Sequence, residues 1–111
     1  MAFTSPTKQV ALVTGASSGM GKETAKRLLQ EGLVVYVAAR RVAQMEDLRA
    51  LGAIPLQMDI SVDADIVSAV NTITQGHGGI DVEVNNAGIG MHGATEESTL
   101  ADARSHVEVN L

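Results

Sequence analysis

Four short apolar runs are separated by segments in which apolar residues recur at helical spacing. The runs cover residues 9–14, 33–39, 54–60 and 80–84. Short runs rich in β-branched residues are typical of strands that are buried on both faces of a parallel sheet. Strands that alternate with helices lie parallel and are joined by crossovers, with helices on both faces of the sheet. The sequence therefore predicts an α/β fold.

The segments between the runs carry the signals of helices. We expect Ser61 to cap the third helix, with Asp63 and Asp65 in its first turn, and a last helix to begin at about Ser98. The apolar faces of the first three helices consist of residues three or four apart: Gly21, Ala25, Leu28, Met45, Leu48, Ile66, Val70 and Ile73. The predicted order is βαβαβαβ, followed by part of a helix.

Composition narrows the class of protein. A chain of 111 residues has the length of one domain. It contains no cysteine, which excludes disulfides and thiolate metal sites. We predict no metal site of any kind. A net charge of −5 without a basic run argues against a nucleic-acid partner. The N-terminus lacks the pattern of a signal peptide, and no apolar stretch reaches membrane-spanning length. We expect a cytoplasmic protein without a membrane partner.

The positive charges lie mostly in the first half of the chain. The three lysines are Lys8, Lys22 and Lys26, and Arg104 is the one lysine or arginine in the last sixty residues. An anionic ligand is therefore expected against the N-terminal half. A solvated helix face is the alternative explanation for such clustering.

A glycine-rich segment, TGASSGMGKET, follows the first apolar run, and two kinds of phosphate-binding turn are candidates. A P-loop for nucleoside triphosphates would need a glycine in place of Ala16 and a hydroxyl in place of Glu23. A carboxylate beside the phosphates is the wrong group for that loop. Gly15, Gly19 and Gly21 instead lie between a strand and a helix, as a dinucleotide-binding turn requires.

Each residue of this turn has a physical role in the dinucleotide hypothesis. Gly15 adopts the tight turn, Gly19 allows the backbone to approach a pyrophosphate, and Gly21 allows the helix to pack closely on the strand. The pyrophosphate then lies at the helix N-terminus, where free N–H groups favour an anion. Ser17 and Ser18 add hydroxyl donors.

Four features of the chain, in this order, resemble the short-chain dehydrogenase/reductase family. The Thr14-Gly15-x-x-x-Gly19-x-Gly21 spacing is similar to the family's cofactor turn, and Asp59 is similar to its aspartate at the adenine ring. Asn85-Asn86-Ala87-Gly88 resembles the NNAG segment that stabilises the sheet and flanks the cofactor. Asn110, within HVEVNL, resembles the asparagine of the catalytic tetrad. The resemblance spans residues 14–110 and implies a Rossmann-like parallel sheet flanked by helices.

The end of the second run indicates which dinucleotide is preferred. Ala38-Ala39-Arg40-Arg41 contains no carboxylate to bind a ribose 2′-hydroxyl, whereas arginine suits a 2′-phosphate. We therefore expect NADP(H) to be preferred, with NAD(H) as the alternative cofactor. A plain basic start to a helix is the alternative explanation of the two arginines.

These observations together define the predicted site. Its catalytic residue is Asn110, by resemblance. The predicted cofactor-binding residues are Thr14, Gly15, Ser17, Ser18, Gly19, Met20, Gly21, Arg40, Arg41, Asp59, Ile60, Asn86, Ala87 and Gly88. The three histidines, His77, His92 and His106, match no position of the family's site.

Part of the family's catalytic machinery has no counterpart in these residues. The resemblance implies hydride transfer between a nicotinamide and a small alcohol or ketone, assisted by a Tyr-x-x-x-Lys pair in which the ammonium lowers the pKa of the phenol. Tyr36 is the only tyrosine, it lies inside the second predicted strand, and no lysine follows Lys26. The pair cannot be formed within residues 1–111.

The end of the chain also bears on function. It lies one residue after Asn110, inside the last predicted helix, so we expect an incomplete domain, truncated after the fourth strand and part of the following helix. The complete family fold implies a homo-oligomer. A non-catalytic nucleotide-binding remnant or an incomplete gene product is the alternative interpretation. Glu83, in the fourth strand, is expected to be buried, where an unpaired carboxylate would be costly, and that strand is expected to form an edge of the sheet.

Overall fold

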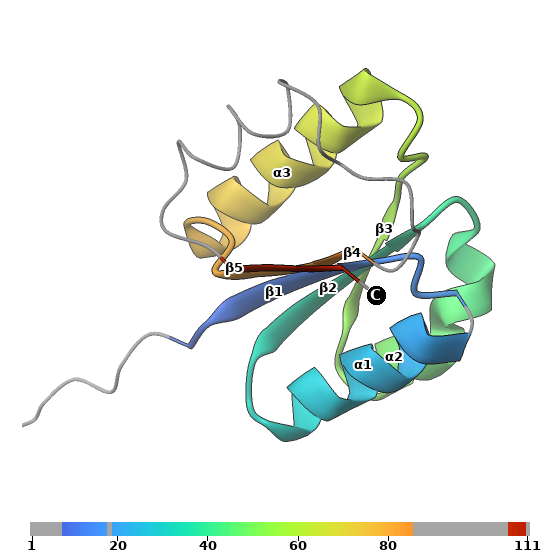
Figure 1. Cartoon of the computed structure of the whole chain (residues 1–111), viewed down its shortest axis with the longest axis vertical. Coiled ribbons are helices and arrows are strands. Elements are labelled where there is room, and N and C mark those ends of the chain that lie inside the picture. Colours follow the sequence, from blue (N-terminus) through green and yellow to red (C-terminus); the bar gives the residue numbers. More distant parts are fainter. Residues whose placement is uncertain (1–7, 18, 86–106, 111) are drawn as a thin grey trace, which may run out of the picture.

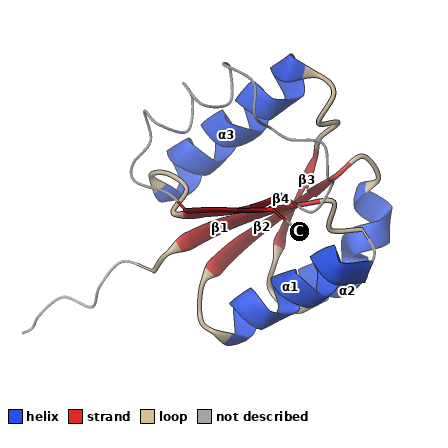
Figure 2. Cartoon of the chain, viewed as in Figure 1, coloured by secondary structure: helices blue, strands red, loops and turns tan. Residues whose placement is uncertain are grey.

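The structure is a computed structural model that describes residues 8–17, 19–85 and 107–110. It is a parallel sheet with α1 and α2 on one face and α3 on the other (Figures 1 and 2). The elements are β1 (Val10–Thr14), α1 (Gly19–Gln30), β2 (Val34–Ala39), the 3₁₀ helix η1 (Val42–Met45), α2 (Glu46–Ala50), β3 (Ile54–Gln57), α3 (Asp63–His77), β4 (Val82–Asn85) and β5 (Val107–Asn110). The described strands lie in the order β3-β2-β1-β4-β5. The predicted Rossmann-like α/β fold is confirmed.

Strand β1 lies inside the sheet and is buried along its whole length. It pairs in parallel with β2 on one side and with β4 on the other. The register places Thr14 beside Ala38 of β2 and Asn85 of β4. The carboxyl ends of these three strands therefore meet at one edge of the sheet, where ligands bind in folds of this kind.

Alternating residues of β1 supply two hydrophobic clusters, one on each face of the sheet. Leu12 belongs to the cluster beneath α3, and Val13 to the cluster beneath α1 and α2. The predicted helix faces are confirmed, because the structure buries these residues and leaves only Leu28 partly exposed: Gly21, Ala25, Met45, Leu48, Ile66, Val70 and Ile73.

The connection from β3 to α3 differs from the prediction. β3 ends at Gln57 rather than at residue 60, and α3 begins at Asp63 after Val62. Ser61 does not cap α3, because its hydroxyl donates a hydrogen bond of 2.6 Å to Asp59 Oδ1. The local turn thus takes the hydroxyl that the helix terminus would otherwise use, as Asp and Ser side chains often do next to helices.

The prediction of a helix that reaches residue 111 is wrong for residues 107–110. They form β5, which pairs in parallel with β4 so that Val82 lies beside Val107 and Asn85 beside Asn110. Both strands read VEVN, and alternating β-branched residues favour a strand over a helix. The fourth strand is therefore not an edge of the described sheet, whereas the start of the predicted helix, near Ser98, lies outside the described residues.

Two polar side chains lie within or against the cluster beneath α3. Glu83 is completely buried, as expected, and strand pairing places it beside Leu12. Tyr36 of β2 is 3% exposed, and its hydroxyl lies 2.6 Å from Nδ1 of His77, the last residue of α3. Burial raises the pKa of the Tyr36 phenol, which favours its neutral form. The contact joins the C-terminus of α3 to the sheet.

We predict that Tyr36→Phe lowers the free energy of unfolding by about 1 kcal/mol, because a hydrogen bond is lost while the apolar packing is retained. Urea denaturation followed by circular dichroism measures the change. Thr72→Ala is the control: the Thr72 hydroxyl donates a hydrogen bond of 2.9 Å to the Ser68 carbonyl on the exposed side of α3, and its removal should change the free energy of unfolding by less than about 0.5 kcal/mol. Equal stabilities of Tyr36→Phe and the unaltered chain would contradict a structural role for this contact.

Candidate cofactor-binding site

The turn between β1 and α1 has a backbone conformation that suits glycine. Gly15 and Gly19 have φ angles of 64° and 56°, in the left-handed region that side chains disfavour. Apart from its chain neighbours and the backbone of its own helix, the described part of the chain has no atom within 4 Å of the position that a Cβ of Gly19 would occupy. Gly21 is buried in the first turn of α1, and this turn contains no acidic residue. An anion can therefore approach the main-chain N–H groups at the start of α1.

Thr14 lies in the sheet directly before the turn. Its hydroxyl oxygen is 3.3 Å from Asn85 Oδ1 and 3.4 Å from the Val84 carbonyl oxygen. Thr14 and Asn85 are 0% and 1% exposed. These contacts connect the ends of β1 and β4, so Thr14 fixes the base of the turn.

A pocket of about 430 Å³ opens beyond the carboxyl ends of β1, β2 and β3. Five of its lining residues were predicted from sequence: Gly15, Ser17, Arg40, Asp59 and Ile60. Four others were missed: Ala38, Ala39, Met58 and Ser61. All four lie at or just after the ends of β2 and β3, a position that the strand pattern alone could have indicated.

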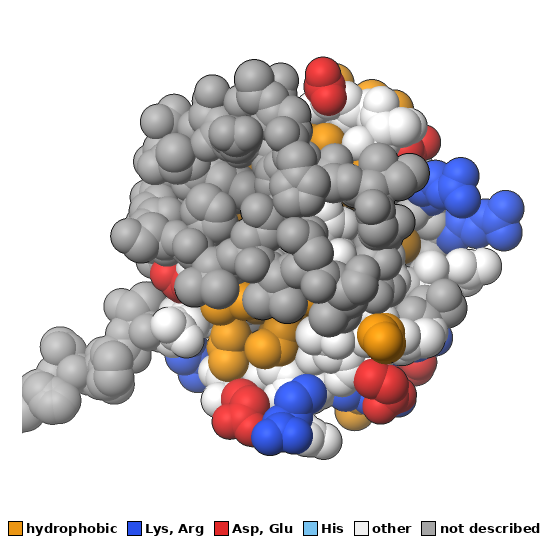
Figure 3. Space-filling model, viewed as in Figure 1, with side chains coloured by type: hydrophobic (Ala, Val, Ile, Leu, Met, Phe, Trp, Pro, Cys, Tyr) orange, Lys and Arg blue, Asp and Glu red, His pale blue; other side chains and the backbone are white. Residues whose placement is uncertain are grey.

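The two predicted arginines occupy different places. Arg40 lines the pocket, whereas Arg41 comes just before η1, and its carbonyl accepts a hydrogen bond of 3.2 Å from the Gln44 N–H. Both side chains are exposed. Figure 3 shows Lys and Arg side chains gathered beside the loop that follows β2. Arg40 is therefore the better placed of the two to contact a ligand in the pocket.

Asp59, which follows β3, also lines the pocket and is oriented by a local turn. Its Oδ1 accepts hydrogen bonds from the Ser61 hydroxyl, at 2.6 Å, and from the Ser61 N–H, at 2.9 Å. These two bonds, with a smaller contribution from the charge of Arg40, lower the pKa of the Asp59 carboxyl. The Asp59 N–H donates to Asp65 Oδ2 at 3.0 Å, which ties this wall to α3. Asp59 is thus held in one orientation as an anion.

The remaining predicted residues fall into two groups. Met20 is 63% exposed in the first turn of α1, and Asn110 lies in β5 rather than in a helix. The positions Ser18, Asn86, Ala87 and Gly88 lie outside the described residues. The structure therefore brings together the glycine turn, Arg40 and the Asp59 wall, and it corrects the secondary structure expected around Asn110.

Two features are absent from the residues that the structure describes. None of their helices is both long enough and apolar enough to cross a membrane. No cluster of three or more His, Cys, Asp or Glu side chains suited to a metal ion occurs in this part of the chain.

A glycine turn at a helix N-terminus, beside a pocket at the ends of parallel strands, is the arrangement of a dinucleotide site. A family model described as short chain dehydrogenase matches residues 9–111. The chain belongs to the short-chain dehydrogenase family.

Known members of the family share both sequence and structure with this chain. Human dehydrogenase/reductase SDR family member 11 is 40% identical over 89 residues, which cover 73% of this chain and 34% of the human protein. A short-chain dehydrogenase from Streptomyces avermitilis superposes with a TM-score of 0.84 at 26% identity, over 96% of this chain and 49% of that one.

A solved structure with its cofactor also matches. An actinorhodin polyketide ketoreductase variant with NADPH gives a TM-score of 0.67 at 39% identity, over 86% of this chain and 40% of that one. This member of the short-chain dehydrogenase family thus spans between a third and a half of the length of these three relatives.

We predict that Ser61→Ala raises the pKa of the Asp59 carboxyl toward that of an exposed aspartate, because its strongest hydrogen bond is removed. Carbon-13 NMR titration of the Asp carboxyl signals measures the change. Asp47 is an internal control, since its pKa is lowered mainly by Lys22 and should not move.

The same change affects stability in acid. A carboxyl whose pKa is lowered by folding stabilises the folded state above the unfolded pKa, and this contribution is lost as the pH falls through the folded pKa. Because the Asp59 pKa is lowered less in Ser61→Ala, Asp59 should contribute a smaller loss of folding stability in acid in this variant than in the unaltered chain. An Asp59 pKa that stays the same in the variant would contradict the assigned hydrogen bond.

Proposed function

We propose that residues 1–111 form an NAD(P)-binding domain that prefers NADP(H) to NAD(H). The observation that carries the proposal is the place of Arg40, which lines the pocket directly after β2. This is where related folds bind the ribose next to the adenine. No carboxylate occurs in Ala38-Ala39-Arg40-Arg41 to bind a free 2′-hydroxyl or to repel a 2′-phosphate.

The described residues fit the cofactor in chemistry and shape. The left-handed Gly15 and Gly19 leave the N-terminus of α1 open to a pyrophosphate. Arg40 supplies a planar guanidinium that can hold a 2′-phosphate through two hydrogen bonds. Asp59 and Ile60 line the pocket, and Asp59 is similar to the family's aspartate at the adenine ring.

The bound cofactor would exchange a hydride with an alcohol or ketone. The match to a ketoreductase with NADPH supports both this substrate class and this cofactor. For residues 1–111 we propose binding and orientation of the cofactor rather than the transfer itself. Their only tyrosine, Tyr36, is buried in β2 against His77, so its hydroxyl is not available to a substrate.

Titration of the purified chain with NADPH and NADH, followed by nicotinamide fluorescence, tests the proposal. We expect NADPH to bind at least tenfold more tightly, because a charge-assisted hydrogen bond contributes about 1.5–3 kcal/mol. Arg40→Gln should remove most of this difference by weakening NADPH binding, and it should leave NADH binding within about twofold.

Arg49→Gln is the matched control. Arg49 is an exposed arginine of α2 that pairs with Glu46 of the same helix and does not line the pocket. It should keep the preference for NADPH. Equal binding of the two cofactors by the unaltered chain, or a preference that survives Arg40→Gln, would refute the proposed role of Arg40.

A further inference from the structure

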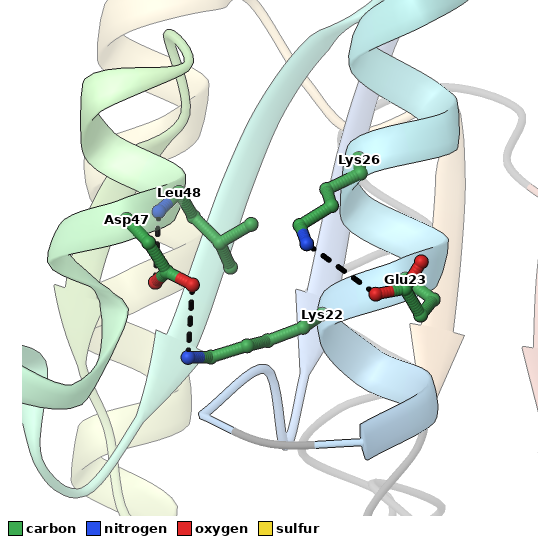
Figure 4. Close-up of polar contacts among 5 residues, drawn as sticks. All are labelled: Lys22, Glu23, Lys26, Asp47 and Leu48. Carbon is green, nitrogen blue, oxygen red and sulfur yellow. Dashed lines mark hydrogen bonds and ion pairs between the residues drawn. The ribbon is translucent and has the colours of Figure 1, made fainter.

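An ion pair connects α1 to α2 close to the pocket. Lys22 Nζ lies 3.0 Å from Asp47 Oδ2, across 25 residues of sequence (Figure 4). Three other ion pairs of the described residues join side chains only three or four positions apart, within a helix or at its C-terminal end: Lys26–Glu23, Arg27–Glu31 and Arg49–Glu46. Pairs of that kind stabilise the helix that contains them. Lys22 and Asp47 instead fix two helices relative to each other.

The two segments that this pair joins both carry proposed cofactor ligands. Lys22 directly follows Gly21 in the first turn of α1, so its backbone continues the glycine turn. Asp47 lies in the first turn of α2, which follows η1 and the Arg40-Arg41 pair. We call residues 40–47 the arginine segment. The ion pair therefore connects the pyrophosphate side of the site to the side that faces a 2′-phosphate.

Asp47 is oriented by both of its oxygens. Oδ2 accepts the bond from Lys22, and Oδ1 accepts a bond of 3.0 Å from the Leu48 N–H (Figure 4). Lys22 provides the largest contribution to the lowered pKa of the Asp47 carboxyl, which therefore remains charged near neutral pH. Side-chain exposures of 25% for Lys22 and 50% for Asp47 leave the pair at the surface, where it is worth little as a source of stability.

Apolar contacts hold the arginine segment against the sheet, but they do not direct it toward the turn. Met45 lies in this segment and Leu48 directly follows it. Both are fully buried and pack in one cluster with Ala25 of α1. Such contacts are non-directional. The Lys22–Asp47 bond has a fixed length and joins two defined atoms, so it restrains the segment along α1.

We propose that Lys22 and Asp47 are positioning residues that hold the arginine segment in register with the glycine turn, and thereby strengthen the discrimination between NADPH and NADH by Arg40. This inference rests on the proposed function. Neither residue lines the pocket. Their contribution is to the ratio of the two affinities, because only NADPH carries the phosphate that Arg40 would meet.

A direct electrostatic effect of the two charges predicts a different result. Lys22→Gln leaves a negative charge near the site and Asp47→Asn leaves a positive charge, so Coulomb interaction alone would change NADPH affinity in opposite directions. Positioning predicts that both variants lower the NADPH-to-NADH affinity ratio. The expected fall is about two- to fivefold, the range for an exposed ion pair.

Two further variants complete this experiment. Lys26→Gln removes the same charge one turn further along α1, where Lys26 pairs with Glu23 in the same helix (Figure 4), and it should leave the ratio unchanged. Lys22→Arg retains a cation that can reach Asp47, so this variant should keep most of the NADPH-to-NADH affinity ratio of the unaltered chain. Opposite shifts in Lys22→Gln and Asp47→Asn would overturn the positioning role, as would an equal fall in Lys26→Gln.

Amide hydrogen exchange without cofactor tests the same inference separately. The Gln44 N–H bonds to the Arg41 carbonyl at 3.2 Å and reports on the arginine segment. Its exchange should be faster in Lys22→Gln and Asp47→Asn but not in Lys26→Gln. If the exchange of the Gln44 N–H is unchanged in Lys22→Gln and Asp47→Asn, the inference is overturned, even if the unaltered chain prefers NADPH. Equal binding of both cofactors by the unaltered chain would instead refute the proposed function, while faster Gln44 exchange would still show that the pair holds the segment.

Discussion

The candidate site depends on the parallel register of β1 with its two neighbours. Because β1 is buried along its length and paired on both sides, its carboxyl end cannot shift without breaking two sets of main-chain hydrogen bonds. The register places the ends of β2 and β4 at the same level as Thr14. The glycine turn therefore begins at a fixed point, and the pocket lies beside it.

Buried polar groups reinforce this edge of the sheet. The Thr14 hydroxyl lies within 3.4 Å of oxygen atoms of Val84 and Asn85, in surroundings closed to water. A polar contact in such surroundings is costly to leave unsatisfied, so it favours one alignment of β1 and β4. On the other side of the pocket, the bonds of Asp59 to Ser61 and Asp65 fix the wall that follows β3. These contacts restrain the main chain on both sides of the pocket.

The sequence predicted most of the fold because its signals are local. Apolar runs, helix periodicity and the glycine positions identified four strands and the glycine turn. The five predicted pocket residues also depended on the arginines after the second run and on the family resemblance, which supplied Arg40 and Asp59. The prediction failed where another interaction competes with the local signal. Ser61 has the chemistry of a helix cap, but Asp59 two residues earlier takes its hydroxyl. Residues 107–110 were expected to continue the helix predicted from about Ser98, although their VEVN sequence repeats that of β4 and pairs with it in register.

The Lys22–Asp47 pair shows a different limit of sequence reasoning. Lys22 was counted among the positive charges available to an anionic ligand, yet its ammonium is bonded to Asp47. No pattern within one helix could show this, because the partner is 25 residues away and becomes a neighbour only when α1 and α2 pack on the same face of the sheet. Arg40, in contrast, lines the pocket together with Asp59. The charges available to an anionic ligand at this edge therefore depend on where folding pairs each charge, as well as on how many charges the sequence contains.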